Sequence, residues 1–131
     1  MAADRLISSG GPWESVIGYS RATVAGDYVH VSGSTATIDG VLQHEGDAYN
    51  QTKVTLEQVI APALAQAGYT LADVVRSRIY LSNADDMDAV GKAHGEIFGE
   101  IRPAATMLAG IQFINPKMLV EIEVDAWKRN T

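Results

Sequence analysis

The chain has 131 residues, 47% of them hydrophobic and 20% charged, and this length and composition predict one globular domain rather than a disordered chain. It contains no cysteine, which excludes disulfides, thiolate metal sites and a cysteine nucleophile. The formal charge of −6 argues against nucleic acid as a partner, because phosphate binding depends on Lys and Arg. No signal-peptide core and no apolar run of roughly 20 residues is present, so we expect a cytoplasmic protein without a membrane partner.

Hydrophobic spacing separates the expected helices from the expected strands. Two segments carry apolar residues at three- and four-residue intervals, as amphipathic helices do, and the others alternate apolar and polar residues. Gly68 is a natural end for the first helix, and Pro62 inside that helix predicts a kink. The elements expected in chain order are a strand at 5–10, a hairpin at 19–33 turning at Gly26-Asp27, a second turn at Asp39-Gly40, a helix at 47–68, a strand at 73–83, a helix at 84–100, and strands at 104–111 and 119–127.

This β-β-β-α-β-α-β-β order predicts an α+β two-layer sandwich, in which both helices cover one face of a mixed sheet. The strand at 73–83 is expected to turn Val75, Ser77, Ile79 and Leu81 toward the helices. The uncovered face suits either open water or a subunit interface in which opposite charges pair, and its mixed charges favour the interface. Its expected residues are Arg76, Arg78, Tyr80, Glu121, Glu123 and Asp125.

Four segments, "GYSRATVAGDYVHVSG", "LADVVRSRIYLSN", "RPAATM" and "NPKMLVEIEVDA", resemble the reactive intermediate deaminase superfamily (Rid, or YjgF-like) in order and spacing. The resemblance covers about residues 19–126 and implies a fold like that of the bacterial chorismate mutases. It also implies a homotrimer whose sheets form a central barrel, with small-molecule clefts between subunits. Active members of the superfamily hydrolyse enamines and imines, such as those derived from 2-aminoacrylate, without a metal or cofactor. The acidic face would then lie against neighbouring subunits.

The resemblance also implies roles for individual residues. Glu121 matches the acid that holds and activates the attacking water, and Tyr19 and Ser32 match residues of the pocket wall. Ser32 also fits a purely structural role, since Ser32-Gly33 could simply end a strand. Glu121 could instead form a structural ion pair with an arginine of a neighbouring subunit.

The chain departs from the superfamily at the substrate anchor. Ala105 stands where active members carry the arginine that binds the substrate carboxylate, and Arg102 lies before the proline instead. Met107 occupies a position that is often cysteine, and Gly91 replaces an asparagine on the second helix. The chain is therefore identified as a member of a subgroup lacking the carboxylate-binding arginine. The small residues Ala105 and Gly91 leave room for a substrate larger than 2-aminoacrylate, such as a ring-cleavage product like 2-aminomuconate.

Two arginines could supply the missing anchor from another direction. Arg21 shares strand parity with Tyr19, and Arg78 lies on the uncovered face, so either could present a bidentate guanidinium to a ligand. For each residue singly, pairing with an interface carboxylate is the more economical interpretation. His94 lies on the apolar stripe of the second helix, which favours a satisfied core histidine over a catalytic one. The pattern leaves open whether Trp13 and Glu14 cap the cleft or pack the N-terminal segment.

Three functions therefore compete. The first is hydrolytic deamination of an enamine or imine, with Glu121 as the catalytic acid and Tyr19, Ser32, Ala105, Met107, Gly91 and Arg21 or Arg78 lining the site. The second is a non-catalytic or regulatory trimer whose clefts hold a small metabolite. The third is the RNA-directed activity attributed to some members of the superfamily, which the acidic charge makes the weakest of the three. None of them requires a metal, and no metal-binding motif is present in the sequence.

Overall fold

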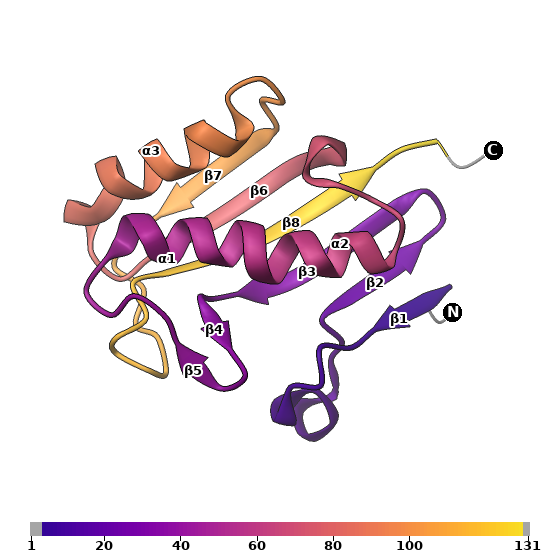
Figure 1. The fold of residues 1–131 in the computed structure, drawn as a ribbon, viewed down its shortest axis with the longest axis horizontal. Helices are drawn as coiled ribbons and strands as arrows, with labels where there is room; N and C mark the ends of the chain where they lie inside the picture. Colours follow the sequence, from indigo (N-terminus) through magenta and orange to yellow (C-terminus); the bar gives the residue numbers. More distant parts are fainter. Residues whose placement is uncertain (1–3, 130–131) are drawn as a thin grey trace.

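The computed structural model describes residues 4–129, which form a six-stranded mixed sheet with helices on one face (Figure 1). The strand order is β1-β2-β3-β8-β6-β7, with β6 and β7 parallel and the other neighbours antiparallel. This confirms the predicted α+β sandwich. The bounds are β1 Arg5–Ile7, β2 Ala22–Ala25, β3 Tyr28–Ser34, β4 Thr37–Ile38, β5 Val41–Leu42, β6 Val74–Leu81, β7 Ala104–Leu108, β8 Val120–Trp127, α1 Ala48–Val54, α2 Ala61–Gln66 and α3 Met87–Phe98, with short helical segments η1 Glu14–Gly18, η2 Thr55–Ile60, η3 Leu71–Asp73 and η4 Ala84–Asp86.

The segments α1, η2 and α2 form the long helix predicted at 47–68. It begins where the Asp47 side chain accepts a 3.0 Å hydrogen bond from the Asn50 N–H, and Gly68 follows its end with a left-handed φ of 82°. Pro62 cannot donate a backbone hydrogen bond, and the turn before it widens to π hydrogen bonding over η2. The sequence predicted a kink near Pro62, and what the structure shows there is a π segment directly before α2.

The core lies between the sheet and the helices. In β8 the alternate residues Val120, Ile122, Val124 and Ala126 are buried, while the residues between them face the uncovered side. Buried side chains of the long helix, among them Leu56, Ile60 and Leu64, complete this core. Among residues 4–129, no helix has the length and apolarity needed to cross a membrane.

Two predicted details of the strands are wrong, and both errors come from β-bulges. Val74, not Val75, is buried at the start of β6, and Val75 is 42% exposed, because the pairing with β8 slips between Val74 and Arg76. Likewise, Ser32-Gly33 does not end β3, which continues to Ser34 after a second slip against β8. An extra residue in one strand reverses the alternation of faces beyond it, and the sequence pattern carries no sign of this.

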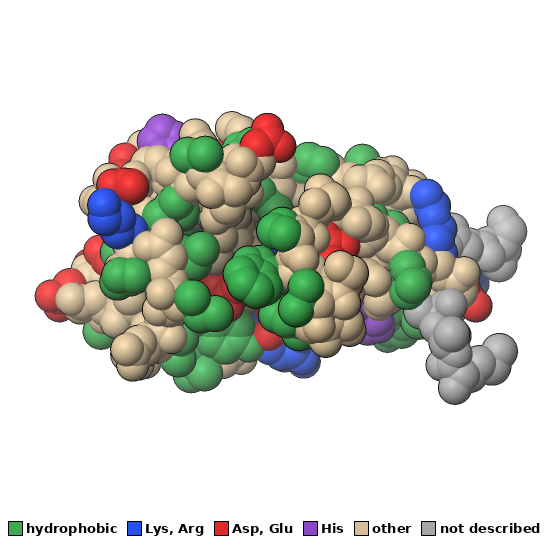
Figure 2. Space-filling model, turned by 90° about the horizontal axis from the view of Figure 1, so that it is seen from below, with side chains coloured by type: hydrophobic (Ala, Val, Ile, Leu, Met, Phe, Trp, Pro, Cys, Tyr) green, Lys and Arg blue, Asp and Glu red, His purple; other side chains and the backbone are tan. Residues whose placement is uncertain are grey.

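Two strands are shorter than predicted, and one predicted turn belongs to a separate hairpin. The first strand ends at Ile7 rather than Gly10, and β7 ends at Leu108 rather than Ile111, before Gly110 adopts a φ of 81°. The predicted turn at Asp39-Gly40 joins β4 and β5 in a small separate hairpin. Hydrophobic side chains reach the surface along the edge where η1, β4 and β5 lie (Figure 2). The large exposed hydrophobic residues of these segments and of the loop before β8 include Trp13, Val16, Ile17, Val41 and Ile114.

Candidate functional site

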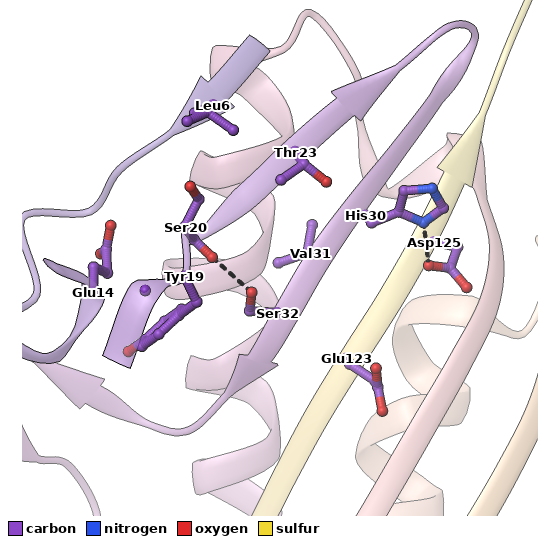
Figure 3. A pocket seen from close by; sticks show the side chains of 11 residues that line it. Leu6, Glu14, Tyr19, Ser20, Thr23, His30, Val31, Ser32, Glu123 and Asp125 are labelled. Atoms are coloured by element: carbon purple, nitrogen blue, oxygen red, sulfur yellow. Dashed lines mark hydrogen bonds and ion pairs between the residues drawn. The ribbon is translucent and has the colours of Figure 1, made fainter. Parts of the chain in front are cut away.

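An open depression of about 590 Å³ lies between the η1 segment and the uncovered face of β2, β3 and β8 (Figure 3). Tyr19 and Ser32, both predicted as pocket residues, line this depression. The other lining residues bring one imidazole and three carboxylates to the same place: they are Leu6, Glu14, Gly18, Ser20, Thr23, His30, Val31, Glu123 and Asp125. Glu121 lies beside the depression, two residues before Glu123 on the same face of β8.

Glu14 fixes the N-terminal wall of the depression. Its buried carboxylate accepts hydrogen bonds from the Ser9 hydroxyl at 2.7 Å and from the backbone N–H groups of Ser9 and Gly11 at 3.2 Å each. Burial opposes ionisation of Glu14, but these hydrogen bonds outweigh it and lower its pKa. Trp13 is 62% exposed, so Glu14 and not Trp13 packs the N-terminal segment. Glu14 both packs the N-terminal segment and lines the depression, so the two roles that the sequence left open coincide in it.

Ser32 and Tyr19 occupy neighbouring positions on the wall. The Ser32 hydroxyl donates a 2.6 Å hydrogen bond to the Ser20 carbonyl, so its proton is already engaged and its lone pairs remain as acceptors (Figure 3). The Tyr19 N–H donates to the Glu14 carbonyl at 2.9 Å, which links the wall to the anchored η1 segment. The Tyr19 ring is 36% exposed and accessible to a ligand.

Glu121 is a half-buried carboxyl packed against a glycine. A Cβ on Gly33 would lie only 3.1 Å from the Glu121 Cδ, so any other residue there would push the carboxyl away by a few tenths of an ångström. Burial raises the pKa of Glu121, the nearby Arg21 charge lowers it, and Glu123 raises it further, with a net increase. A carboxyl with a raised pKa can exchange protons with water nearer neutral pH than an ordinary glutamate.

The two candidate arginines differ sharply in their surroundings. Arg78 Nη1 lies 3.3 Å from Asp125 and 3.8 Å from Glu123, so two carboxylates balance its charge. Arg21 donates through Nη2 to the Gly33 carbonyl at 2.6 Å, and its guanidinium lies 5.8 Å from the Tyr19 ring centroid. Within residues 4–129, no carboxylate lies within ion-pair distance of Arg21. The pairing interpretation thus describes Arg78 within one chain, whereas Arg21 is left without a counter-ion there.

The rest of the uncovered face is a connected polar network. His30 Nδ1 lies 2.7 Å from Asp125, and the Tyr80 hydroxyl donates to Glu123. The pKa of Tyr80 is raised mainly by this hydrogen bond to Glu123 and to a smaller extent by burial. Within residues 4–129, no group of three or more His, Asp or Glu side chains is arranged to hold a metal ion. Glu123 and Asp125 therefore have partners of different kinds on their own chain.

Ala105 and Met107 lie apart from Glu121 within one chain. They pair with Ser77 and Ile79 of β6, whose side chains are buried on the helix side of the sheet, whereas Glu121 faces the other side. The order β2-β3-β8-β6-β7 also separates Ala105 from the Arg21 and Tyr19 region at the start of β2 by four strand spacings, about 19 Å. A single chain does not bring these predicted site residues together.

Gly91, Arg102 and His94 also take defined positions. A Cβ on Gly91 in α3 would meet no atom within 4 Å, so space remains beside it. Arg102 is exposed at the junction of α3 and β7, with a φ of 56° and its N–H bonded to the Phe98 carbonyl at 2.8 Å. His94 Nε2 is 2.8 Å from the buried Ser77 hydroxyl, and burial lowers the His94 pKa. His94 is thus a satisfied histidine between helix and sheet, as predicted.

The sequence interpretation missed several residues of the depression. Thr23 and His30 reach it only because the β2-β3 hairpin and the η1 segment fold onto the same sheet face, whereas Glu14 was already weighed as a cap of the cleft. Strand parity could have identified His30, which pairs directly with Asp125 across β3 and β8. Gly33 carries no signal other than being a glycine within an alternating strand, which is a known mark of a bulge or a close approach.

Comparison with known proteins gives the relationship of this chain. The Endoribonuclease L-PSP family matches residues 12–128. An uncharacterised protein of Streptomyces coelicolor is 43% identical over 96% of this chain and 93% of its own length. The 3-aminoacrylate deaminase RutC of Acinetobacter baylyi is 35% identical over 79% of this chain and 82% of its own length.

Solved structures agree with this relationship. The crystal structure of Rv2704 from Mycobacterium tuberculosis, a member of the YjgF/YER057c/UK114 family, is 44% identical and superimposes with a TM-score of 0.84, covering 95% of this chain and 98% of that one. Escherichia coli TdcF with bound serine shares the fold alone, with a TM-score of 0.76 at 17% identity, over 98% of both chains. The chain therefore belongs to the Endoribonuclease L-PSP family, the YjgF or Rid family that its sequence motifs resemble.

Proposed function

We propose that this protein hydrolyses an enamine or imine to a carbonyl compound and ammonia, with Glu121 as the residue that activates water. The observation that carries this proposal is the half-buried Glu121 carboxyl, whose pKa is raised by burial and which rests on Gly33 beside an open depression. A carboxyl in this state can accept a proton from water and return it within one reaction cycle. The deaminase named among the relatives belongs to the same reaction class.

The proposed chemistry needs only water and one proton relay. Glu121 takes a proton from water as the water oxygen bonds to the imine carbon, and the C=N double bond becomes a single bond. Glu121 then delivers this proton to nitrogen, which gives a carbinolamine with one hydroxyl and one amino group. Glu121 next takes the hydroxyl proton and passes it to the amino nitrogen, the C–N bond breaks with its electron pair going to ammonia, and the C=O double bond forms. The sum is R₂C=NH + H₂O → R₂C=O + NH₃. Ser32, as an acceptor, and Tyr19 would orient the polar groups of the substrate.

The complete site would need a second copy of the chain. The pairing of β6 and β7 keeps Ala105 and Met107 away from Glu121 within one chain, and Gly91 lies on α3, on the helix-covered side of the sheet. A homotrimer with clefts between subunits would bring the β7 edge of one copy to the β2-β3 hairpin of the next. The uncovered face, with half-buried Arg78, Tyr80, Glu123 and Asp125, and the exposed hydrophobic residues Leu6, Trp127 and Leu108 support such an interface.

The substrate is proposed to differ from 2-aminoacrylate. Ala105 has no group that could bind a carboxylate, and open space lies beside Gly91. A larger enamine such as a 2-aminomuconate-like ring-cleavage product would gain contacts that a three-carbon imine cannot make. The rival function, a trimer that binds a metabolite without turnover, differs only in the chemistry of Glu121.

The test is ammonia release from a panel of imines and enamines generated in solution, including 2-iminopropionate and 2-aminomuconate. The wild type is expected to accelerate at least one, and Glu121→Gln to lose about 10²- to 10⁴-fold of that rate, the usual contribution of a general acid or base. Light scattering on both proteins checks that the oligomer is unchanged. Ligand binding without ammonia release by the wild type would instead support the non-catalytic trimer.

A further inference from the structure

The β-bulge in β3 builds a small polar site around Gly33. Val31 pairs with Val124 and Ser34 pairs with Ile122, so the two residues Ser32 and Gly33 together oppose the single residue Glu123. A bulge of this kind leaves a backbone group without its ladder partner. The Gly33 carbonyl accepts instead from Arg21 Nη2 at 2.6 Å, which fixes the guanidinium at the bulge.

The same glycine holds a carboxyl on its other side. Glu121 packs so closely on Gly33 that a Cβ there would lie 3.1 Å from its Cδ and 3.2 Å from its Oε2. Arg21 and Glu121 therefore flank one residue, and the charge of Arg21 is near enough to act on the ionisation of Glu121. No direct ion pair between them exists within residues 4–129, so the two groups are neighbours that do not neutralise each other.

The guanidinium of Arg21 is not saturated by the protein. A guanidinium has five N–H donors, and only the bond to Gly33 is made to a residue of 4–129. Its Nε is buried without a hydrogen-bond partner among these residues, which is unfavourable and would not be expected of an arginine held for structure alone. Arg78, which has the same side chain on the same face, is bonded to Asp125 and lies near Glu123.

We infer that Arg21 binds the carboxylate of the ligand and orients it beside Glu121, in place of the arginine that is absent at Ala105. This rests on the proposed function for the role of Glu121, but not for the binding itself. The terminal nitrogens of the guanidinium offer the planar fork that matches a carboxylate. The Gly33 carbonyl and the Tyr19 ring hold the fork in place, which lowers the entropy lost on binding. The ligand class is thus a carboxylic acid with a carbonyl or imine carbon next to the carboxyl group.

The experiment measures binding rather than turnover. Titration calorimetry compares pyruvate and phenylpyruvate, which carry the carboxylate, with their methyl esters, which have the same skeleton without the charge. The wild type is expected to bind each acid more tightly than its ester. Arg21→Gln is expected to weaken the acids by about 10- to 100-fold, the size of a charge-assisted hydrogen bond, and to leave the esters unchanged.

Two further variants make the result specific. Arg5→Gln removes an exposed arginine of β1 and is the matched control, expected to keep the preference for acids. Arg21→Lys keeps the charge without the fork and is expected to retain only part of the preference, and it serves if Arg21→Gln does not fold. The thermal unfolding midpoint of each variant shows whether the bulge is intact.

Several results would overturn the assignment. They are equal binding of acid and ester by the wild type, an unchanged preference in Arg21→Gln, and loss of the preference in Arg78→Gln instead. Failure of the proposed function gives a different result. If Arg21 binds the carboxylate but no ammonia is released, the deaminase activity is refuted and the assignment of Arg21 stands. If ammonia release needs Glu121 but is unaffected by Arg21→Gln, the deaminase activity stands and the assignment of Arg21 is refuted.

Discussion

Gln51 of α1 is the buried side chain whose loss should show most clearly how the site is supported. It is 0% exposed, and its Nε2 donates to the His44 carbonyl at 3.1 Å and to the Lys117 carbonyl at 3.2 Å. Its Oε1 accepts from the Leu119 N–H at 3.0 Å. Leu119 directly precedes β8, so Gln51 ties the start of the strand that carries Glu121 to the long helix.

The cost of Gln51→Leu follows from these three bonds. Leucine has a similar volume, so the change removes the hydrogen bonds without opening a large cavity. Each bond contributes about 0.5 to 1.5 kcal/mol, and the Leu119 N–H left without a partner adds about 1 to 3 kcal/mol. Burying the more apolar leucine offsets about 1 to 2 kcal/mol. With central values the net loss should be about 3 to 4 kcal/mol, which lowers the unfolding midpoint of a domain of this size by about 9 to 16 °C.

Thermal unfolding followed by circular dichroism, at one protein concentration, measures this shift. Gln66→Leu is the matched control, because Gln66 is exposed on α2 and its replacement should move the midpoint by no more than about 2 °C. If Gln51→Leu moved the midpoint no further than Gln66→Leu, the three hydrogen bonds would not stabilise the fold as argued. A shift in urea midpoint without a change in slope would confirm that stability alone had changed.

Three further predictions concern the site itself. Burial raises the pKa of Glu121 above 4.5, so its ionised carboxyl destabilises the folded state. The free energy of unfolding therefore falls as pH rises through the range above 4.5. Glu121→Gln should remove that fall and raise the unfolding midpoint at pH 7, while abolishing ammonia release. An unfolding midpoint at pH 7 that drops in Glu121→Gln would contradict this. In the Arg21→Gln variant, which lacks the proposed carboxylate anchor, Ala105→Arg should raise kcat/KM for 2-iminopropionate by about 30-fold or more, since a desolvated arginine–carboxylate pair is worth about 2 to 5 kcal/mol; an unchanged kcat/KM would refute the reasoning. Arg102→Ala should leave pyruvate affinity and the oligomer unchanged, because Arg102 is exposed at a helix-to-strand junction; loss of affinity with an intact oligomer would place it in the site.

The sequence alone determined the architecture. Alternation in Val120–Trp127 predicts a strand with one buried face, and the spacing of apolar residues before Gly68 predicts the long helix, because periods of two and about 3.6 residues are local properties of the chain. The family motifs located Tyr19, Ser32 and Glu121, and the structure places the first two on one depression with Glu121 beside it.

Only the tertiary structure decided which charges are free and which are paired. Arg21 and Arg78 look alike in the sequence, but strand pairing sets Arg78 opposite Glu123, whereas Arg21 bonds to the Gly33 carbonyl at the bulge and forms no ion pair with a carboxylate of residues 4–129. The bulges themselves depend on how β3 and β6 meet β8, which is a contact between segments far apart in the chain. Pairing register is a long-range property, so the sequence pattern could name the arginines but not assign their partners.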